Sequence, residues 1–487
     1  MGLRSRLADR FEGREELDLT SGGIGRPLFF LSLPIVITNL FQTAYNLADT
    51  YWLGQYSTES LAAISFAFPM VFLLISLGMG ISVAGSVLVA QYTGAGEDTE
   101  AEYAASQTVT FAVIISLVLG IIGYTGIDSY LRVMGASPGV LPLATVYMEV
   151  ISLGLVFMFG FFVFIALMRG YGDTVTPMLV MFGSVVLNII IDPFLIFGWT
   201  VAEDLPMVGT VAFPELGIEG AAIATVFSRG LAFALGIVIL FRGHRGLQIH
   251  LLDMVPDVAY LRRLARIGIP ASIEGTGRAL SLNLLLFVIA LFPPTIVAAF
   301  GIGTRVFSVI FLPAIAVARG VETMTGQNLG AGKPDRAATA TRLAASTLFV
   351  ILTGAGILIW FTAAPISAVF TTDPAVVEAS ATFLRYVALT FGFTGITRAV
   401  TGSFRGAGKT LTAAAIAMVM LGVVRLPFAL VGALSIGETG IWLAFAVSNV
   451  IGAVITVLWY RRGSWRGGDL TDTRVDSPDG SGVSTDD

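Results

Sequence analysis

Long apolar runs constrain the fold of this chain more than any other feature of its sequence. Runs of about 20 residues recur along almost the whole length, and each is long enough to cross a hydrocarbon core of ~30 Å as a helix. Inside lipid a backbone must satisfy its own hydrogen bonds, so such runs form helices. Only 13% of the residues are charged, against about 25% in soluble domains. The sequence therefore predicts an all-α polytopic membrane protein.

The apolar runs predict twelve membrane-spanning helices. They lie near residues 27–52, 61–90, 103–125, 144–167, 175–199, 218–241, 264–292, 296–325, 340–363, 378–401, 411–434 and 440–460. An even number of spans puts both ends of the chain on one side of the membrane. The tails and loops of that side hold twenty Lys and Arg residues, whereas the opposite loops hold only Arg132. Because cytoplasmic loops are enriched in Lys and Arg, we expect both termini on the cytoplasmic side of the cell membrane.

Matching segments recur in the two halves of the chain at one constant offset. They are "QYTGAG" from Gln91 and "QNLGAG" from Gln327, "RGYGDT" from Arg169 and "RGAGKT" from Arg405, the stretches around Pro34 and Pro270, and "LAAIS" from Leu61 and "VAAFG" from Val297. Each copy of this repeat holds six spans, so both copies have the same orientation. The sequence thus predicts two six-helix lobes related by an axis along the membrane normal, as in transporters built from parallel repeats.

The repeat and the spans together predict five segments. They are an N-terminal cytoplasmic tail (1–26), an N-lobe (27–241), a cytoplasmic linker (242–263), a C-lobe (264–460) and an acidic, disordered cytoplasmic C-terminal tail (461–487). Two such lobes facing one another leave a cleft between them. Rocking one lobe against the other would expose that cleft to each side of the membrane in turn.

The stretch "TGSFRGAGKT" at residues 401–410 ends like a phosphate-binding loop, but its spacing is wrong. Such a loop needs a glycine at the position that Ser403 occupies. In the first copy of the repeat, Asp173 stands in place of the lysine. We therefore expect a turn between spans, with no nucleotide and no nucleic-acid partner. With no Cys and two His, the chain is also expected to hold no metal other than Na⁺.

Polar residues form a stripe along the first span. Asn39, Gln42, Asn46 and Asp49 are spaced by 3, 4 and 3 residues, which places them within an arc of about 80° on a helix. Such a stripe faces away from lipid. We expect it to line a substrate cavity and to end in a carboxylate that binds an ion.

The fifth span repeats this pattern. Ser184, Asn188 and Asp192 stand at i, i+4 and i+8, on one helix face. Pro193 follows and leaves the carbonyl of Ile189 without its helical donor. A carboxylate beside an unpaired carbonyl can hold a proton or Na⁺.

Spans 1 to 5 contain no Lys or Arg, and span 6 contains only Arg229. A carboxylate removed from water without a cationic partner favours binding of a small cation. This reasoning predicts a coupling-ion site at Asp49 and Asp192. Two alternatives stay open: both carboxylates hydrogen-bond neighbouring helices, or Asp49 lies at the wet membrane interface.

Charged residues in spans 7 and 8 stand at spacings that suit ion pairs. Glu274 and Arg278 are at i, i+4, and Arg319 and Glu322 are at i, i+3. We interpret both as structural pairs, with a C-lobe ion site at Glu274 as the alternative. Two further arginines lack a partner nearby in the sequence and either line the cleft or meet carboxylates elsewhere; they are Arg398 and Arg425.

These motifs resemble those of the multidrug and toxic compound extrusion (MATE) family over roughly residues 20–460. The N-lobe motifs are "LPIVITNLFQTAYNLADTYWLG", "AQYTGAG", "MRGYGDTVTPM", "LNIIIDPFLIFG" and "GIEGAAIATVFSR", and the C-lobe motifs are "GQNLGAGKPDRA" and "GSFRGAGKT". The resemblance implies a two-lobe antiporter that exports organic cations and other amphipathic compounds in exchange for H⁺ or Na⁺. It implies membrane lipids as neighbours, no cofactor, no catalytic residues and a monomer.

The resemblance also implies site residues. One branch of the family places its coupling ion in the N-lobe, and Asp49 in "NLADTYW" and Asn188 and Asp192 in "LNIIIDP" match its positions. Thr225 in "AAIATVFS" and Tyr147 in "ATVYMEV" are similar to further members of that site.

Several alternatives remain at the level of sequence. Another branch of the family uses acidic residues of the C-lobe, where Glu274 is the candidate. A lipid-linked oligosaccharide flippase of related fold would prefer a strongly basic cavity, which an N-lobe almost free of Lys and Arg does not offer. A membrane-embedded enzyme would need a nucleophile or metal constellation, and no thiol or cluster of His with carboxylates is present in the sequence.

Overall fold

The computed structural model of the chain describes residues 18–198, 200–205, 209–212 and 214–471. Residues 1–17 of the predicted N-terminal tail lie outside this part. So do residues 472–487, where the acidic stretch of the C-terminal tail is predicted to be disordered.

Long apolar helices make up the first half of the described chain. They are α2 (Gly25–Tyr56), α3 (Thr58–Ala95), α4 (Asp98–Val133), α5 (Leu141–Leu153), α6 (Leu155–Tyr171), α7 (Val175–Phe197) and α8 (Gly217–Arg242), followed in the linker by the short 3₁₀ turn η2 (Leu251–Met254). The predicted spans 175–199 and 218–241 leave a connecting loop between α7 and α8. In the structure, two short strands, β1 (Thr200–Leu205) and β2 (Gly209–Ala212), pair there as an antiparallel hairpin.

The second half follows the same plan. Its elements are α9 (Val258–Ile289), α10 (Pro294–Ile310), α11 (Leu312–Gly330), α12 (Pro334–Ala368), α13 (Pro374–Ala388), α14 (Phe391–Gly406), α15 (Thr410–Met418), the π-helical segment η3 (Val419–Arg425), α16 (Leu426–Ile436) and α17 (Glu438–Arg461). The segments α15, η3 and α16 run on as one span, residues 410–436.

The number of spans agrees with the prediction of twelve. In the described part of the chain, nine helices are long and apolar enough to cross a membrane. Three further spans are each built from two helices with a bend between them, of 53° for α5 and α6, 44° for α10 and α11, and 54° for α13 and α14. The first and third of these breaks lie at Gly154 and near Thr390, which are equivalent positions of the repeat.

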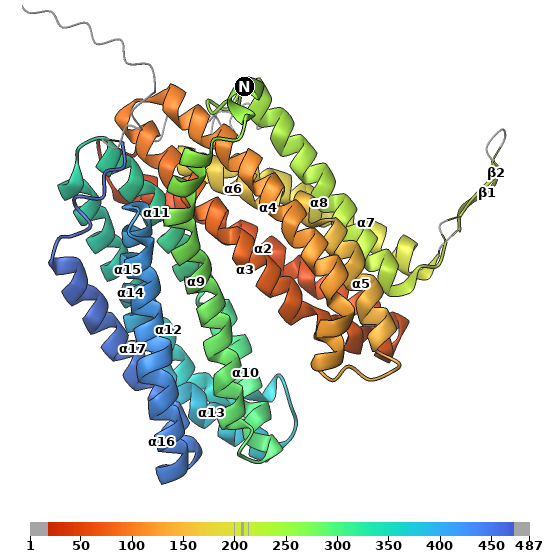
Figure 1. Cartoon of the computed structure of the whole chain (residues 1–487). Coiled ribbons are helices and arrows are strands. Elements are labelled where there is room, and N and C mark those ends of the chain that lie inside the picture. Colours follow the sequence, from red (N-terminus) through yellow and green to blue (C-terminus); the bar gives the residue numbers. More distant parts are fainter. Residues whose placement is uncertain (1–17, 199, 206–208, 213, 472–487) are drawn as a thin grey trace, which may run out of the picture.

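Figure 1 shows the helices in two bundles, an N-lobe from α2 to α8 and a C-lobe from α9 to α17. The bundles meet at the end of the molecule where the linker and residues 462–471 lie, which we name the tail end. They diverge toward the opposite end, which we name the far end (Figure 1). The two-lobe membrane fold predicted from the repeat is confirmed.

Small residues allow the lobes to touch near the tail end. A Cβ on Gly80 of α3 would lie 2.3 Å from the carbonyl oxygen of Gly268 in α9, so neither helix could carry a larger side chain there. Next to this crossing, the Ser272 hydroxyl donates to the carbonyl of Leu77 at 2.9 Å. Helices in lipid associate through close packing and hydrogen bonds, and glycine permits both.

The "GKT" stretch and its counterpart in the first half are both turns. Gly172 between α6 and α7 has φ +107°, and Gly408 between α14 and α15 has φ +67°. Glycine adopts these left-handed values without strain. Lys409 directly precedes α15, so the predicted turn is confirmed.

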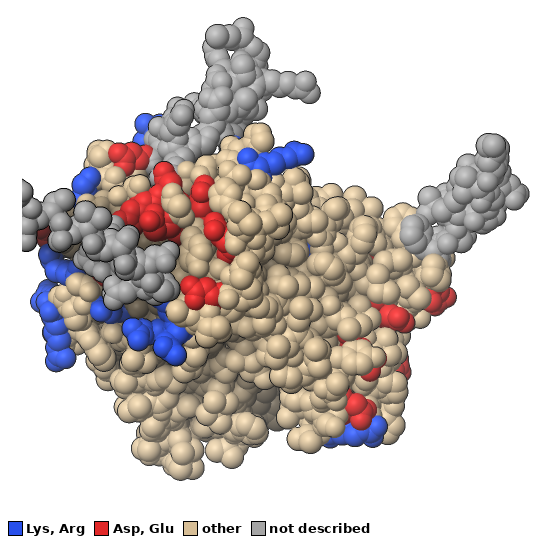
Figure 2. Space-filling model, turned by 45° about the horizontal axis from the view of Figure 1, so that its top comes forward, with Lys and Arg blue, Asp and Glu red and all other residues tan. Residues whose placement is uncertain are grey.

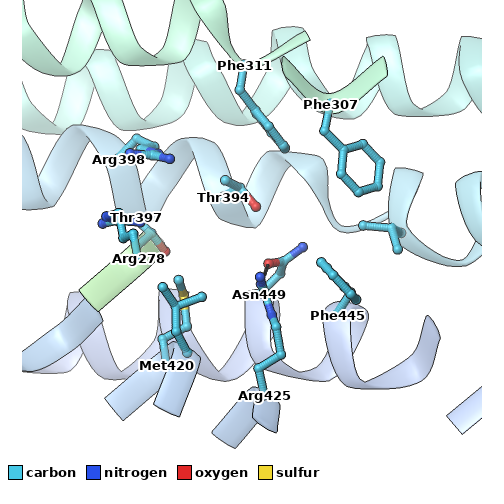
Figure 3. Close-up of a pocket in the computed structure, with 12 residues that line it drawn as sticks. Arg278, Phe307, Phe311, Thr394, Thr397, Arg398, Met420, Arg425, Phe445 and Asn449 are labelled. Atoms are coloured by element: carbon cyan, nitrogen blue, oxygen red, sulfur yellow. Dashed lines mark hydrogen bonds between the residues drawn. The ribbon is translucent and has the colours of Figure 1, made fainter. Parts of the chain in front are cut away.

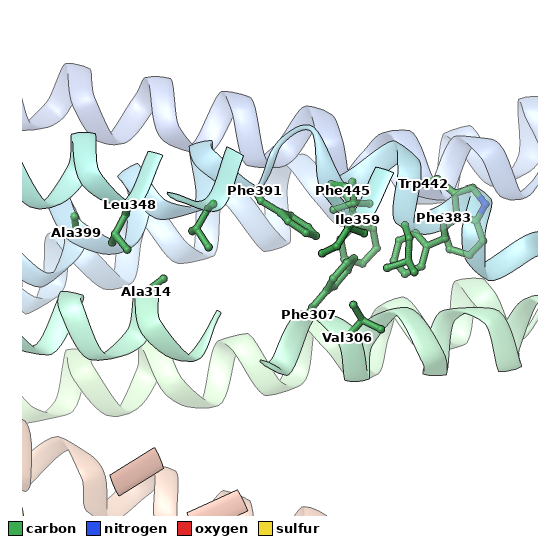
Figure 4. Close-up of a cluster of buried hydrophobic side chains, with 14 of the residues drawn as sticks. Val306, Phe307, Ala314, Leu348, Ile359, Phe383, Phe391, Ala399, Trp442 and Phe445 are labelled. Carbon is green, nitrogen blue, oxygen red and sulfur yellow. The ribbon is translucent and has the colours of Figure 1, made fainter. Parts of the chain in front are cut away.

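Aromatic side chains fill the far half of the C-lobe (Figure 4). The ring of Phe383 packs on Trp442 with centroids 4.3 Å apart, and Phe307 packs against both Phe383 and Phe391 at 5.2 and 5.4 Å. This cluster joins α10, α13, α14 and α17 into one unit.

The start of the C-terminal tail departs from the prediction of disorder from residue 461 onward. Trp465 is buried and stacks on Tyr460 with centroids 4.7 Å apart. The backbone N–H of Leu470 donates to the Gln91 side chain at 2.7 Å. Residues 462–471 are thus held against the C-lobe through Trp465 and against the N-lobe through Leu470.

Candidate functional site

The two carboxylates predicted to bind the coupling ion lie together inside the N-lobe. Asp49 on α2 is 5% exposed and Asp192 on α7 is fully buried. Their carboxyl groups are close neighbours. Neither forms an ion pair with any residue that the structure describes. Two acidic groups this close favour a bound proton or cation between them.

The other predicted members of this site surround the pair. The Asn188 amide donates to Asp192 Oδ1 at 3.0 Å, one helical turn away on α7. The Thr225 hydroxyl on α8 lies within reach of Asp49 and accepts a 2.6 Å hydrogen bond from Tyr45. Tyr147 is buried on α5 close to both carboxylates.

Three oxygen atoms of this cluster are buried without a hydrogen-bond donor among the described residues. They are Oδ1 of Asp49, Oδ2 of Asp192 and Oδ1 of Asn188. Buried acceptors are almost always satisfied, so three orphans in one place indicate a missing partner. Carboxylate and amide oxygens are hard ligands that suit H⁺ or an alkali cation. The described residues include no group of three or more His, Cys, Asp or Glu arranged for a metal ion.

Arg229 on α8 is a buried neighbour that the sequence analysis did not assign to the site. Its guanidinium lies 4.6 Å from the centre of the Tyr45 ring and donates to Gln42 Oε1 at 2.9 Å. It makes no ion pair with Asp49 or Asp192 in the described structure. The sequence does mark Arg229 as unusual, because it is the only basic residue in the first six predicted spans.

The polar stripe of α2 leads from this cluster to a cavity between the lobes. Asn39 and Gln42 line the cavity, which has a volume of about 250 Å³, and Arg169 and Arg319 line it too. The Gln42 amide donates to the Asn46 side chain at 3.1 Å, which continues the stripe toward Asp49. One helix therefore carries both the carboxylate cluster and part of the cavity wall.

Ser184 does not join this stripe. Its hydroxyl donates to the backbone carbonyl of Ser228 at 3.1 Å, and it lines neither this cavity nor the one described below. It holds α7 against α8. The i, i+4, i+8 spacing correctly predicts that Ser184 shares a helix face with Asn188 and Asp192. Around Ser184, however, this face packs against α8.

The predicted ion pairs of the C-lobe are confirmed, and a fifth residue connects them. Arg278 pairs with Glu274 and Arg319 pairs with Glu322, both at 2.9 Å. Arg405 bridges the two glutamates at 3.1 and 3.0 Å and is only 8% exposed. The sequence predicts a turn between spans at residues 401–410, but Arg405 lies in the last turn of α14 and faces inward, toward two buried carboxylates. Arginines therefore neutralise both glutamates, whereas Asp49 and Asp192 form no ion pair among the described residues.

The repeated architecture corresponds to a known family. A family model described as MatE matches residues 34–194 and matches again at residues 270–431. The chain belongs to the MATE family. The two matches begin at Pro34 and Pro270, which are the equivalent prolines of the internal repeat.

Similar proteins cover almost the whole chain. An FAD transporter of Shewanella oneidensis is 31% identical over 433 residues, which are 89% of this chain and 93% of that protein. The probable multidrug resistance protein NorM of Thermotoga maritima is 26% identical over 449 residues, 91% of this chain and 93% of that protein. A solved structure described as the outward-facing conformation of a multidrug resistance MATE family transporter has a TM-score of 0.84 and 25% identity, over 93% of this chain and 98% of that one. The predictions of a MATE-type membrane transporter and of no enzymatic activity are confirmed.

Proposed function

We propose that this MATE-family protein is a secondary active exporter of the plasma membrane. It moves small amphipathic compounds outward in exchange for H⁺ or Na⁺, by alternating access of its two lobes to the cavity between them. The observation that carries the proposal is the pair Asp49 and Asp192, buried together without an ion pair beside orphaned oxygens. An inward ion supplies the partner that this cluster lacks.

The geometry suggests how ion binding acts on the cavity. Asp49 belongs to the same helix as Asn39 and Gln42, which line the cavity. Neutralising the carboxylate removes repulsion from Asp192 and changes the preferred shape of α2, which Pro34 interrupts near the tail end. Bending of α2 then closes the cavity and displaces the substrate.

The driving force is sufficient for efflux. One positive charge moving inward across 100 mV provides about 2.3 kcal/mol. This free energy corresponds to roughly 50-fold accumulation on the outer side, since each 1.4 kcal/mol is tenfold.

We further propose that the tail end faces the cytoplasm. Lys and Arg side chains gather at this end of the face drawn in Figure 2, and a broad uncharged surface separates them from a small charged group at the far end. The excess of Lys and Arg in its loops supports this orientation. With the lobes joined at the tail end, the structure then represents an outward-facing state.

The family resemblance predicts organic cations among the substrates, with the protein acting as a monomer surrounded by lipid. The relatives differ in this respect, because one is named for multidrug resistance and another for FAD. Both names fit small organic compounds.

Dye efflux tests the proposal. We expect Asp49→Asn and Asp192→Asn each to lower ethidium export from cells at least 10-fold, because neither amide can release a bound ion. Asp128→Asn is the matched control, since Asp128 is exposed and pairs with Arg132. If both buried variants export ethidium like the unaltered chain, the N-lobe does not couple transport to ions.

A lipid-linked oligosaccharide flippase is the second candidate function. Arg169 and Arg319 in the wall of the cavity favour it, because a flippase for charged head groups needs a basic cavity. Movement of a fluorescent phospholipid across liposomes without any ion gradient would support the flippase; its absence alongside gradient-driven ethidium transport would support the exporter.

A further inference from the structure

A second cavity, of about 120 Å³, lies inside the C-lobe and is separate from the N-lobe carboxylates. Figure 3 shows how its walls are built. Phe307 and Phe311 reach in from one side and Arg425 from the opposite side, with Arg398 and Thr394 of α14 between them. The pocket thus combines aromatic rings with guanidinium groups.

The charge of Arg425 is held by neutral groups. Its guanidinium donates to Ser448 Oγ and to Asn449 Oδ1, both at 2.8 Å, and lies 4.4 Å from the centre of the Phe445 ring. No carboxylate among the described residues pairs with it. These contacts orient the side chain but leave its positive charge uncompensated.

Arg398 lies across the pocket and is still less satisfied. Its half-buried side chain makes no hydrogen bond or ion pair with any residue that the structure describes. Arg278, the third arginine in the wall, already pairs with Glu274. The wall of the pocket therefore holds three arginines and no carboxylate, and the pairing of Arg278 with Glu274 leaves about two positive charges in excess.

Such an arrangement is unfavourable unless an anion is present. Removing a guanidinium from water costs several kcal/mol, which only an opposite charge with hydrogen bonds offsets. The planar fork of arginine matches a carboxylate or phosphate group. The rings of Phe307, Phe311 and Phe445 add an apolar wall of the kind that binds aromatic ligands.

The backbone at the pocket is unusual as well. Met420, Leu421 and Arg425, all in its wall, belong to the π-helical segment η3. A π-helical turn is rare and is frequently found at functional sites. Its equivalent span in the N-lobe, α7, contains Pro193 but has no π-helical segment. The two halves of the chain therefore differ in backbone structure at the C-lobe pocket.

We infer that the C-lobe pocket binds the anionic group of an aromatic compound, and that organic anions are substrates of the protein. The claim that organic anions are transported rests on the proposed export function. The claim that the pocket binds an anionic group does not. The cavity is close in size to the ~150 Å³ that accommodates benzene, so it holds one ring or an anionic head group. Arg278, one of the lining residues, has a side chain that is 23% exposed.

Three ligands with one ring system test the inference: 1-naphthyl phosphate, neutral 1-naphthol and cationic 1-naphthylmethylammonium. Binding is measured by equilibrium dialysis with purified protein in phosphatidylcholine nanodiscs, whose lipid carries no net charge. We expect the phosphate to bind at least 10-fold more tightly than the ammonium compound. Equal affinities for the two charged ligands, or no binding of the phosphate, would overturn the inference.

Variants identify the pocket. Arg398→Gln and Arg425→Gln should each weaken binding of 1-naphthyl phosphate at least 10-fold, whereas Arg398→Lys should retain part of the affinity. Arg305→Gln is the control, because Arg305 is exposed on α10 and is not part of the wall. Since the Arg398 side chain makes no hydrogen bond or ion pair with a described residue, Arg398→Gln should melt at or above the temperature of the unaltered chain. Equal weakening by Arg305→Gln contradicts the assignment.

Transport separates this inference from the proposed function. Ion-driven ethidium transport without any binding of 1-naphthyl phosphate would refute the anion pocket and leave the exporter standing. Binding that requires Arg398 in a protein whose transport ignores every ion gradient would refute the exporter and leave the pocket standing. In liposomes, gradient-driven movement of 1-naphthyl phosphate should fall in Arg398→Gln; unchanged movement would overturn its role as substrate.

Discussion

Gln91 and Gln327, which occupy equivalent positions of the internal repeat, clasp the two lobes together by matching contacts. The Gln91 amide donates to the backbone carbonyls of Gly406 and Gly468 in the second half of the chain, at 3.0 and 2.9 Å. The Gln327 amide donates to those of Gly170 and its neighbour Tyr171 in the first half, at 3.0 and 3.1 Å. Gly170 and Gly406 are themselves equivalent positions of the repeat. The repeat therefore builds a pseudo-two-fold interface at the tail end.

Removing either clasp should open the tail end. Gln327→Ala loses two buried hydrogen bonds, and Gln91→Ala loses two as well as the one that it accepts from Leu470. At about 1 kcal/mol each, we expect a shift of at least roughly 30-fold toward the state that opens there. Because the chain contains no Cys, spin labels at Thr99→Cys and Thr339→Cys, both exposed near the tail end, report the distance between the lobes.

Gln107→Ala is the control for this measurement. Its amide donates to the carbonyls of Asp253 and Val255 at 2.6 and 2.7 Å, but these lie in the linker rather than the opposite lobe. We expect its label distances to match those of the unaltered chain. Identical distances in all three alanine variants would show that the clasps do not govern closure.

The close approach of backbones at the same interface gives a second prediction. A Cβ on Gly94 would lie 2.0 Å from the Gln327 carbonyl oxygen, and one on Gly330 would lie 1.9 Å from that of Gln91. Gly94→Ala should therefore prevent the tail end from closing. In inside-out vesicles, a membrane-impermeant maleimide should then label Ser82→Cys in the cavity more than 10-fold faster. Gly354→Ala, whose Cβ meets no atom within 4 Å, should leave the labelling rate unchanged.

The buried ion network of the C-lobe should matter for stability and not for coupling. Glu322→Gln leaves Arg319 without its partner and Arg405 with only one, and breaking a buried pair costs about 3–5 kcal/mol. We expect a clearly lower melting temperature in detergent, with ion-dependent transport retained in the protein that remains folded.

The exposed pair of Asp335 and Arg466 is the matched control for this network. Asp335→Asn should change stability by less than about 1 kcal/mol. A Glu322→Gln protein that melts like Asp335→Asn would mean that the network contributes little, and loss of ion dependence in Glu322→Gln would move the coupling site to the C-lobe.

Much of the fold follows from the sequence because its determinants are local. Apolar runs predict the twelve spans, and the repeat predicts the two lobes. The bends at Gly154 and near Thr390 could not be predicted, because the apolar composition continues through them. The strand pair at residues 200–212 depends on pairing within a loop that has no apolar pattern.

The sequence predicts the individual residues of the candidate site, but it does not predict which of them contact one another. Helical spacing identified Asp49 and Asp192 separately, whereas their contact depends on how α2 packs against α7. Tyr45 and Arg229 were missed because their roles arise from packing between α2 and α8. The sequence predicts that Arg405 belongs to a turn between spans. Its burial depends on Glu274 and Glu322, which are distant in the sequence and which only the fold brings next to it.

The most direct measurement is ethidium transport by purified protein in liposomes, under a pH gradient and a Na⁺ gradient imposed separately. If Asp49 and Asp192 bind the coupling ion, at least one gradient should accelerate transport by the unaltered chain. Asp192→Asn should abolish that acceleration while ethidium exchange without a gradient persists. Equal acceleration of Asp192→Asn and the unaltered chain would contradict an N-lobe coupling site.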